Sequence, residues 1–200
     1  FGVAAKACSI ESIQSGVTTI MDMTPTPDGD KKVALIDAFE EVGIRANVGY
    51  GYASLEQQDC YQWLRGEIKD TLDYCIGKMT GVSLTAFQTW NNSREMLEAT
   101  AAVADEFGLP VITHCLETDF DNEECIRVHG QGEIETLAKT GLLKDNLIIV
   151  HGVTITDEQI QMICRSGASV SYSPVCNMYL ASGFAPVKEM LDAGMIVSIS

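Results

Sequence analysis

The chain has 200 residues, 46% of them hydrophobic and 20% charged, a composition typical of a globular domain with a sizeable core. Its formal net charge of −15 opposes binding to nucleic acid and to anionic membranes, because both are negatively charged. We therefore expect no nucleic-acid partner and no membrane partner. No apolar run reaches the length of about 18 residues that a transmembrane helix needs.

The cysteines and the two chain ends bear on cellular location and on domain organisation. Seven cysteines are spread along the chain without a C-x-x-C pair, and several lie within apolar or helical patterns. We interpret them as reduced thiols that pack as small hydrophobic residues, which is typical of a cytoplasmic protein. The chain starts at Phe1 within a helical pattern and ends at Ser200 within a strand-like pattern. We expect residues 1–200 to be the central part of one longer domain.

In the first half of the chain, β-branched or apolar runs alternate with stretches of helical periodicity. We expect strands at residues 17–23, 44–50 and 81–86. Helices are expected at 32–42 and at 55–79, and the second of these is expected to break near Gly66. Residues 24–29 hold two prolines and form the expected first loop.

The second half repeats this alternation. Ser93 is the expected N-cap of a helix that ends at Gly108. Strands are then predicted at 110–115, 147–152, 168–173 and 195–200. Helices are predicted at 123–139, in two pieces around residues 130–132, and at 156–166 and 185–193.

The alternation of seven predicted strands with six predicted helices implies a parallel sheet covered by helices. An open doubly wound sheet would satisfy it, but no glycine-rich turn follows the first strand to mark a nucleotide site. A (β/α)8 barrel needs one strand more and about 250 residues. We therefore expect an α/β fold of the TIM-barrel type, with residues 1–200 supplying strands 2 to 8 of an incomplete barrel.

Two histidines end consecutive predicted strands. His114 ends the strand at 110–115, and His151 ends the strand at 147–152. Catalytic groups of barrels stand at the carboxyl ends of the strands, so the two rings are expected to converge. A single histidine in such a place is more often a packed core residue, whereas two at adjacent strand ends favour a site. His129 lies on a predicted helix, and we interpret it as a plain surface residue.

Imidazole groups at a barrel mouth suit a divalent metal ion, zinc above all and iron as the alternative. Two histidines rarely hold a catalytic ion alone, because three or more protein ligands are usual. Glu117 follows His114 by three residues and is placed to move protons as a carboxylate that does not bind the metal. The alternative is that Glu117 is an ordinary carboxylate of a loop or helix entry.

Four segments, in order along the chain, resemble the amidohydrolase superfamily in its branch of cytosine, guanine and adenosine-analogue deaminases and triazine chlorohydrolases. The segment SGVTTIMDM at 15–23 is similar to a strand of the family, and VITHCLET at 111–118 is similar to its H-x-x-E-T segment. The segment IVHGV at 149–153 resembles the sixth strand with its histidine. Residues 173–187 resemble the P-x-S-N-x-x-L-x-S-G segment, with Cys176 in place of serine.

The resemblance implies a metal-dependent hydrolase fold and assigns roles to three residues. His114 would be a metal ligand, Glu117 the proton shuttle, and His151 would lie against the metal ion or its water. The family's H-x-H pair would precede Phe1, and its last aspartate would come shortly after Ser200.

Three further residues are expected to contact substrate: Gln88, Trp90 and Asn177. Many adenosine-analogue deaminases of this branch carry a histidine where this chain has Phe87. Gln88 and Trp90 would line a pocket for a planar heterocycle by hydrogen bonding and stacking. The alternative for both is ordinary loop packing.

The expected reaction is hydrolytic deamination of an amino-substituted nitrogen heterocycle of the purine, pyrimidine, pterin or triazine type. Displacement of chloride from a triazine-like ring is the alternative among enzymes, and a non-catalytic truncated barrel is the alternative outside them. The partner is thus a small-molecule heterocyclic substrate. We also expect a homo-oligomer, either a dimer or a larger assembly.

Overall fold

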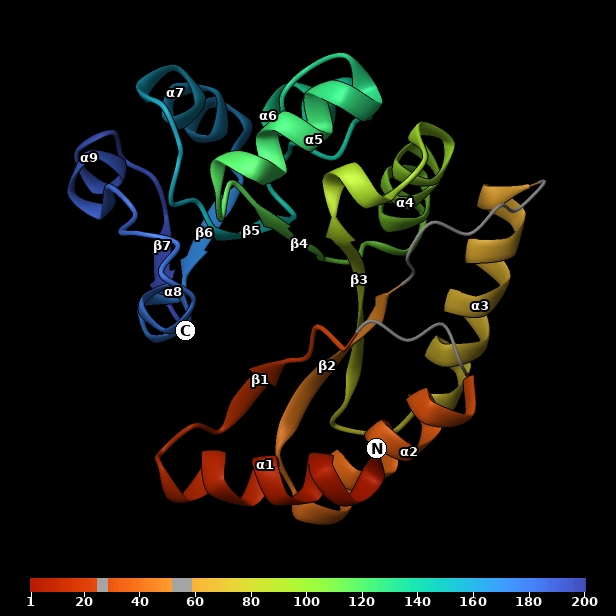
Figure 1. The fold of residues 1–200 in the computed structure, drawn as a ribbon. Coiled ribbons are helices and arrows are strands. Elements are labelled where there is room, and N and C mark those ends of the chain that lie inside the picture. The colour runs from red at the N-terminus through yellow and green to blue at the C-terminus, as the bar shows by residue number, and fades with distance from the viewer. Residues whose placement is uncertain (25–28, 52–58) are drawn as a thin grey trace.

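A computed structural model describes residues 1–24, 29–51 and 59–200. Within these residues, seven strands form one sheet in the order β1 to β7, and each neighbouring pair is parallel. The sheet curves into an open arc with β1 and β7 at its edges, and helices line its outer side (Figure 1). The expectation of an α/β fold with seven parallel strands of a partial barrel is confirmed.

The strands lie close to their predicted positions, and each differs by one to a few residues at its ends. They are β1 (Thr19–Met21), β2 (Arg45–Gly51), β3 (Gly81–Gln88), β4 (Val111–Cys115), β5 (Leu147–His151), β6 (Ser169–Tyr172) and β7 (Val197–Ile199). The edge strands β1 and β7 are shorter than predicted because each pairs with a single neighbour. In contrast, β3 is longer than predicted and runs on to Gln88.

Helices of the described residues alternate with these strands. They are α1 (Gly2–Gln14), α2 (Gly29–Val42), α3 (Cys60–Tyr74), α4 (Arg94–Phe107), α5 (Asp119–His129), α6 (Glu133–Lys139), α7 (Asp157–Ser166), α8 (Pro174–Leu180) and α9 (Val187–Asp192), with a 3-10 helix η1 (Thr89–Asn91). None of the helices in the described ranges combines the length and the apolar composition of a membrane span.

The differences in the helices have local causes. α3 continues through Gly66, since one glycine costs a helix only about 1 kcal/mol and the flanking turns are packed. α8 was not predicted from the sequence. It begins at Pro174, and a proline at the first helical position favours a helix start. Residues 25–28 of the expected first loop and residues 52–58 lie outside the described residues.

The expected helix ends around β4 are confirmed by their capping contacts. Ser93 Oγ accepts the Met96 N–H at 3.2 Å and begins α4. Gly108 ends α4 in the left-handed conformation with φ 65°. A residue with a side chain avoids this conformation, so glycine lets the chain turn directly into β4. α5 and α6 are separated at residues 130–132, as predicted.

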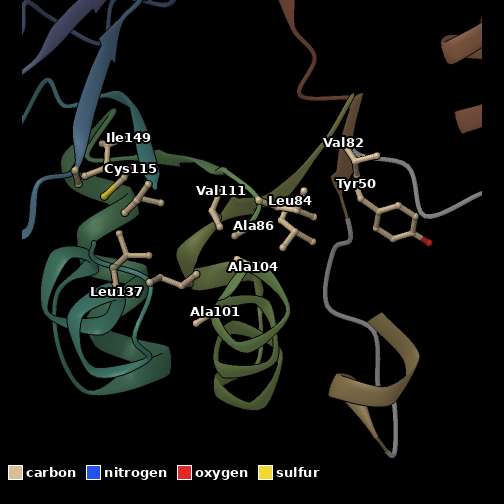
Figure 2. Close-up of a cluster of buried hydrophobic side chains, with 14 of the residues drawn as sticks. Tyr50, Val82, Leu84, Ala86, Ala101, Ala104, Val111, Cys115, Leu137 and Ile149 are labelled. Atoms are coloured by element: carbon tan, nitrogen blue, oxygen red, sulfur yellow. The ribbon is translucent and has the colours of Figure 1, made fainter. Parts of the chain in front are cut away.

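The hydrophobic core lies between the outer side of the sheet and its helices. Figure 2 shows Leu84 and Ala86 of β3 with Ala101 and Ala104 of α4, whose small side chains let helix and strand approach closely. Leu137 of α6 packs in the same way near β4 and β5. Burying each large apolar side chain stabilises the fold by about 1.5–3 kcal/mol. Because strand residues alternate between faces, the remaining residues point to the inside of the arc.

Candidate metal and catalytic site

The inside of the arc holds a cavity of about 640 Å³. Its walls include Ile112, Ile148 and Val150, and both strand-end histidines line it. A second cavity of about 430 Å³ lies between α1, β1 and α2 and is lined by no histidine. The chemistry that the sequence predicts therefore belongs to the first cavity.

His114 and His151 converge because their strands are parallel neighbours. β4 and β5 pair in register, with His114 opposite Val150 and Cys115 opposite His151. The two imidazole rings stack, with their centroids 5.3 Å apart and their planes at 23°. The predicted convergence of the two histidines at one edge of the sheet is confirmed.

His151 reaches the cavity through an unusual backbone conformation. Leu147 and Ile149 of β5 belong to the core with the helices, whereas Ile148 and Val150 line the cavity. By this alternation the ring of His151 would point to the helices. Its φ of 83° is left-handed instead, and the ring lines the cavity. Such a conformation costs a residue with a side chain about 1–2 kcal/mol, a strain often found at functional sites.

His114 is oriented by an irregularity in β3. The register of β3 with β4 shifts between Thr85 and Gln88, and Phe87 in between has φ 41°. This turn points the Phe87 carbonyl at His114, whose Nδ1 donates to it at 2.7 Å. With Nδ1 protonated, the lone pair of a neutral His114 ring is on Nε2. Burial lowers the pKa of His114, and His151 acts in the same direction, so the neutral form is favoured.

The Glu117 carboxylate lies between His151 and a serine. Its Oε2 is 3.5 Å from His151 Nε2, and its Oε1 accepts from Ser182 Oγ at 3.1 Å. On the other side of the His151 ring, Asn177 Nδ2 lies 3.0 Å from Nδ1. If Asn177 donates to Nδ1, the neutral ring carries its proton on Nε2, which faces Glu117. This arrangement suits a carboxylate that exchanges protons beside a hydrogen-bond donor.

The three residues expected to contact substrate have other contacts. Asn177 is fully buried and touches His151. Trp90 Nε1 donates to Asp121 Oδ1 at 3.1 Å, and the Gln88 carbonyl accepts from the Asn92 amide at 2.8 Å. None of the three is among the described residues that line the cavity of about 640 Å³. Their contact with a substrate stays a prediction.

His129 is not a plain surface residue. It ends α5, is half-buried, and its Nε2 lies 3.3 Å from the Thr89 carbonyl. Packing of η1 against α5 brings this carbonyl to the ring, which a helix pattern alone could not reveal. His129 lines a small pocket with Arg94 and Lys139, apart from the other two histidines.

Two residues of the site were not predicted from the sequence. Ser182 holds Glu117, and Glu133 of α6 is completely buried with its Oε2 2.7 Å from the Leu116 nitrogen. Burial raises the pKa of Glu133 to about 7. A buried acid at a helix start has the same sequence pattern as an exposed one, so no local pattern distinguishes Glu133.

The donor atoms fit part of a metal site. His114 offers Nε2 to the cavity while a backbone carbonyl holds its Nδ1, the usual outer contact of a metal-binding histidine. Among the residues that the structure describes, no group of three or more His, Cys, Asp or Glu side chains is arranged to hold an ion. The described residues thus bring two imidazole rings together, fewer protein ligands than a catalytic ion usually has.

The fold is that of a partial (β/α)8 barrel, and this cluster lies at the carboxyl ends of its strands, where barrel enzymes hold their active sites. Residues 3–200 match the model of the amidohydrolase family, and the chain belongs to that family. The chain is 35% identical over 198 residues to 5'-deoxyadenosine deaminase of Methanopyrus kandleri. The match covers 98% of this chain and 44% of the relative, so the chain spans about half the length of that protein.

Solved structures agree with this fold. Guanine deaminase from C. acetobutylicum, with bound guanine in its active site, aligns over 100% of this chain and 51% of its own, at 21% identity and a TM-score of 0.88. Atrazine chlorohydrolase from Arthrobacter aurescens TC1, complexed with zinc, aligns over 98% of this chain and 47% of its own, at 22% identity and a TM-score of 0.83.

Proposed function

We propose that the full-length protein is a metal-dependent aminohydrolase that removes the amino group from an adenine-type ring of a nucleoside. The observation that carries the proposal is the convergence of His114, Glu117 and His151 at one edge of the sheet. The substrate class is supported by the relative from Methanopyrus kandleri, a 5'-deoxyadenosine deaminase. The proposed domain is one barrel, of which residues 1–200 are the central part.

His114 is the residue of this chain best suited to hold the metal, since its Nε2 is unprotonated and faces the cavity. The family resemblance implies further ligands outside these 200 residues. His151 is an alternative ligand within them only if its Nε2 carries no proton. A bound divalent ion, zinc by preference, supplies Lewis acidity and lowers the pKa of water.

Glu117 carries the proton transfers. In the overall reaction, the ring carbon gains an oxygen from water and loses its amine as ammonia. Glu117 takes one proton from the attacking water and delivers it to the ring nitrogen. It then moves the second proton, from the added hydroxyl, to the departing amine, which leaves as ammonia. Ser182 holds Oε1, which leaves Oε2 to face His151 and the reacting groups.

His151 supports this transfer as a hydrogen-bond donor. With Asn177 on Nδ1, its Nε2–H is directed to the oxygen that adds to the ring or to the carboxylate of Glu117. The stacked His114 ring and the surrounding apolar residues keep water away from the His151 ring, which strengthens the hydrogen bonds that His151 donates.

A substrate panel tests the proposal. We would supply the zinc-loaded full-length protein with 5'-deoxyadenosine, adenosine, guanine and atrazine, and measure released ammonia and chloride separately. We expect ammonia from the adenine nucleosides and no chloride from atrazine. Chloride release without ammonia would favour the dechlorination alternative, and no turnover of any compound would favour the non-catalytic one. Light scattering of the same sample tests the predicted homo-oligomer.

A further inference from the structure

Glu133 is a buried acid to which the proposed reaction assigns no role. It is the first residue of α6, and its side chain has no exposed surface. Its Oε2 accepts the backbone N–H of Leu116 at 2.7 Å. Its own backbone N–H donates to Asn122 Oδ1 at 3.1 Å, which fixes the start of α6. The carboxylate therefore connects α6 firmly to the residue that precedes Glu117.

Both backbone polar groups of Leu116, its N–H and its carbonyl, form hydrogen bonds. While Glu133 accepts its N–H, its carbonyl accepts the N–H groups of Val153 at 2.8 Å and Thr154 at 3.0 Å. Leu116 itself is left-handed, with φ 55°, and buried. That conformation costs about 1–2 kcal/mol, so it persists only where surrounding contacts hold it.

The residue after Glu117 is held as well. The backbone N–H and the hydroxyl of Thr118 both donate to Asp121 Oδ2, at 2.9 and 2.7 Å. Gly152, which follows His151, donates to the Cys115 carbonyl at 3.1 Å. Glu117 thus sits between two anchored residues, and the same contacts tie its strand end to that of His151.

We propose that Glu133 is a positioning residue: by accepting the Leu116 N–H, it holds the left-handed turn that directs the Glu117 carboxylate to His151. The catalytic part of this inference rests on the proposed function. The structural part concerns only the Leu116 turn and stands on the contacts described above.

The chemistry of the site suggests which substitutions separate the possibilities. Burial raises the pKa of Glu133 to about 7, with the Leu116 N–H opposing that change and the Asp121 charge adding to it. A neutral acceptor is therefore a fair substitute, and Glu133→Gln keeps an oxygen for Leu116. Glu133→Met keeps the volume and removes the acceptor. Glu133→Asp keeps the carboxyl group but shortens the side chain by one methylene, which moves the carboxyl group away from the Leu116 N–H.

A matched control lies at the other end of the strands, where β3 begins. Glu40 of α2 also accepts a backbone N–H, that of Thr80 at 2.9 Å, and the Thr80 hydroxyl at 2.7 Å. Thr80 precedes β3 at its amino end, away from Glu117. Glu40 is half-buried, and Glu40→Met removes the same kind of contact to a backbone N–H, so it should alter stability alone.

The experiment measures kcat, KM and metal content of the full-length protein, together with hydrogen exchange at the Leu116 amide. We expect Glu133→Met and Glu133→Asp to lose protection at Leu116 and to lower kcat on the order of 10²-fold, as a misplaced catalytic group does, with little change in KM or metal content. Glu133→Gln should retain both kcat and protection, and Glu40→Met should retain kcat.

Several results would overturn the inference. Normal kcat in a folded Met or Asp variant that has lost Leu116 protection would remove the positioning role. Unchanged hydrogen-exchange protection at Leu116 in those variants would refute the structural part. This protection can be measured even if the wild type has no activity. Absence of wild-type activity would refute only the proposed function. Failure of both Met and Asp variants to fold would make Glu133 a purely structural residue.

Discussion

All strands begin at one side of the sheet, here called the amino edge, and end at the other side, the carboxyl edge. The backbone makes left-handed turns at both, but with different residue types. At the amino edge, helices turn into strands through glycines such as Gly108 and Gly167, with φ 65° and 81°. At the carboxyl edge, Phe87, Leu116 and His151 adopt left-handed conformations although they carry side chains. Glycine does so without steric cost, whereas the other three pay about 1–2 kcal/mol each. The backbone is thus strained at the edge that holds the candidate site.

Buried polar contacts differ between the edges in the same sense. At the amino edge, Asn146 donates to the Leu109 carbonyl at 2.9 Å. This contact provides a backbone group with a hydrogen-bond partner and orients no residue of the candidate site. At the carboxyl edge, the Phe87 carbonyl orients His114, and Asn177 orients His151. Contacts at the first edge should therefore affect stability, and contacts at the second should affect chemistry.

The largest expected effect at the carboxyl edge comes from Glu117→Gln in the full-length protein. The amide keeps the shape but cannot accept a proton, so turnover should fall by about 10²–10⁴-fold. Metal content should be retained, and the free energy of unfolding should change by about 1 kcal/mol or less. Turnover, metal content and denaturant unfolding of one preparation check this. Unchanged turnover would give the proton transfer to another residue, with His151 the first candidate, and lost metal would make Glu117 a ligand.

The next effect is the pH dependence of stability caused by Glu133. Its pKa is raised from the ordinary value of 4.5 to about 7 in the folded protein, so the folded state binds the proton more tightly than the unfolded state. Its contribution is fully present below pH 4.5 and is lost as the pH rises through 7. Relative to Glu133→Gln, the wild type should lose about 3 kcal/mol between pH 4 and pH 8. Urea unfolding at both pH values measures this, and parallel curves for the two proteins would show that Glu133 titrates normally.

Asn177→Ala should have a smaller effect and distinguishes two roles. If Asn177 orients His151, its loss should lower kcat by about 10–100-fold, as loss of an outer contact of an active-site histidine does, with KM nearly unchanged. If Asn177 contacts substrate, as the sequence predicted, KM should rise instead. Steady-state kinetics with the best substrate of the panel decides between the two.

The smallest effect is expected at the amino edge. A methyl group on Gly108 would meet no atom within 4 Å, so Gly108→Ala changes only the cost of φ 65°. We expect a loss of about 1 kcal/mol in stability and an unchanged kcat. A kcat that fell with intact stability would contradict the division between the two edges.

How much the sequence predicts depends on whether local patterns or distant contacts decide. The cap residues Ser93 and Gly108 were found because capping is local chemistry. The meeting of His114 and His151 followed from parallel strand order. The left-handed backbone that turns the His151 ring to His114 was not predicted, because strand alternation alone points this side chain to the other face.

Contacts between distant segments were the least predictable. The burial of Glu133 depends on how α6 packs near the end of β4. Glu133 and its partner Leu116 are 17 residues apart along the chain. Likewise the Asn177 contact with His151 joins residues 26 positions apart. The motif containing Asn177 suggested a substrate contact, and only the packing of α8 brings this side chain to the histidine.

We propose that the full-length protein holds its metal at the carboxyl edge through His114, and the zinc content of histidine variants examines this assignment. We would load the full-length wild type, His114→Ala and His129→Ala with zinc, remove free ion by dialysis, and measure zinc per chain. His129 is the matched control, because it is a half-buried histidine that also contacts a backbone carbonyl but lies in another pocket. We predict that His114→Ala loses its zinc and that His129→Ala retains it. A His114→Ala protein that keeps one zinc per chain and normal turnover would exclude His114 as the metal ligand.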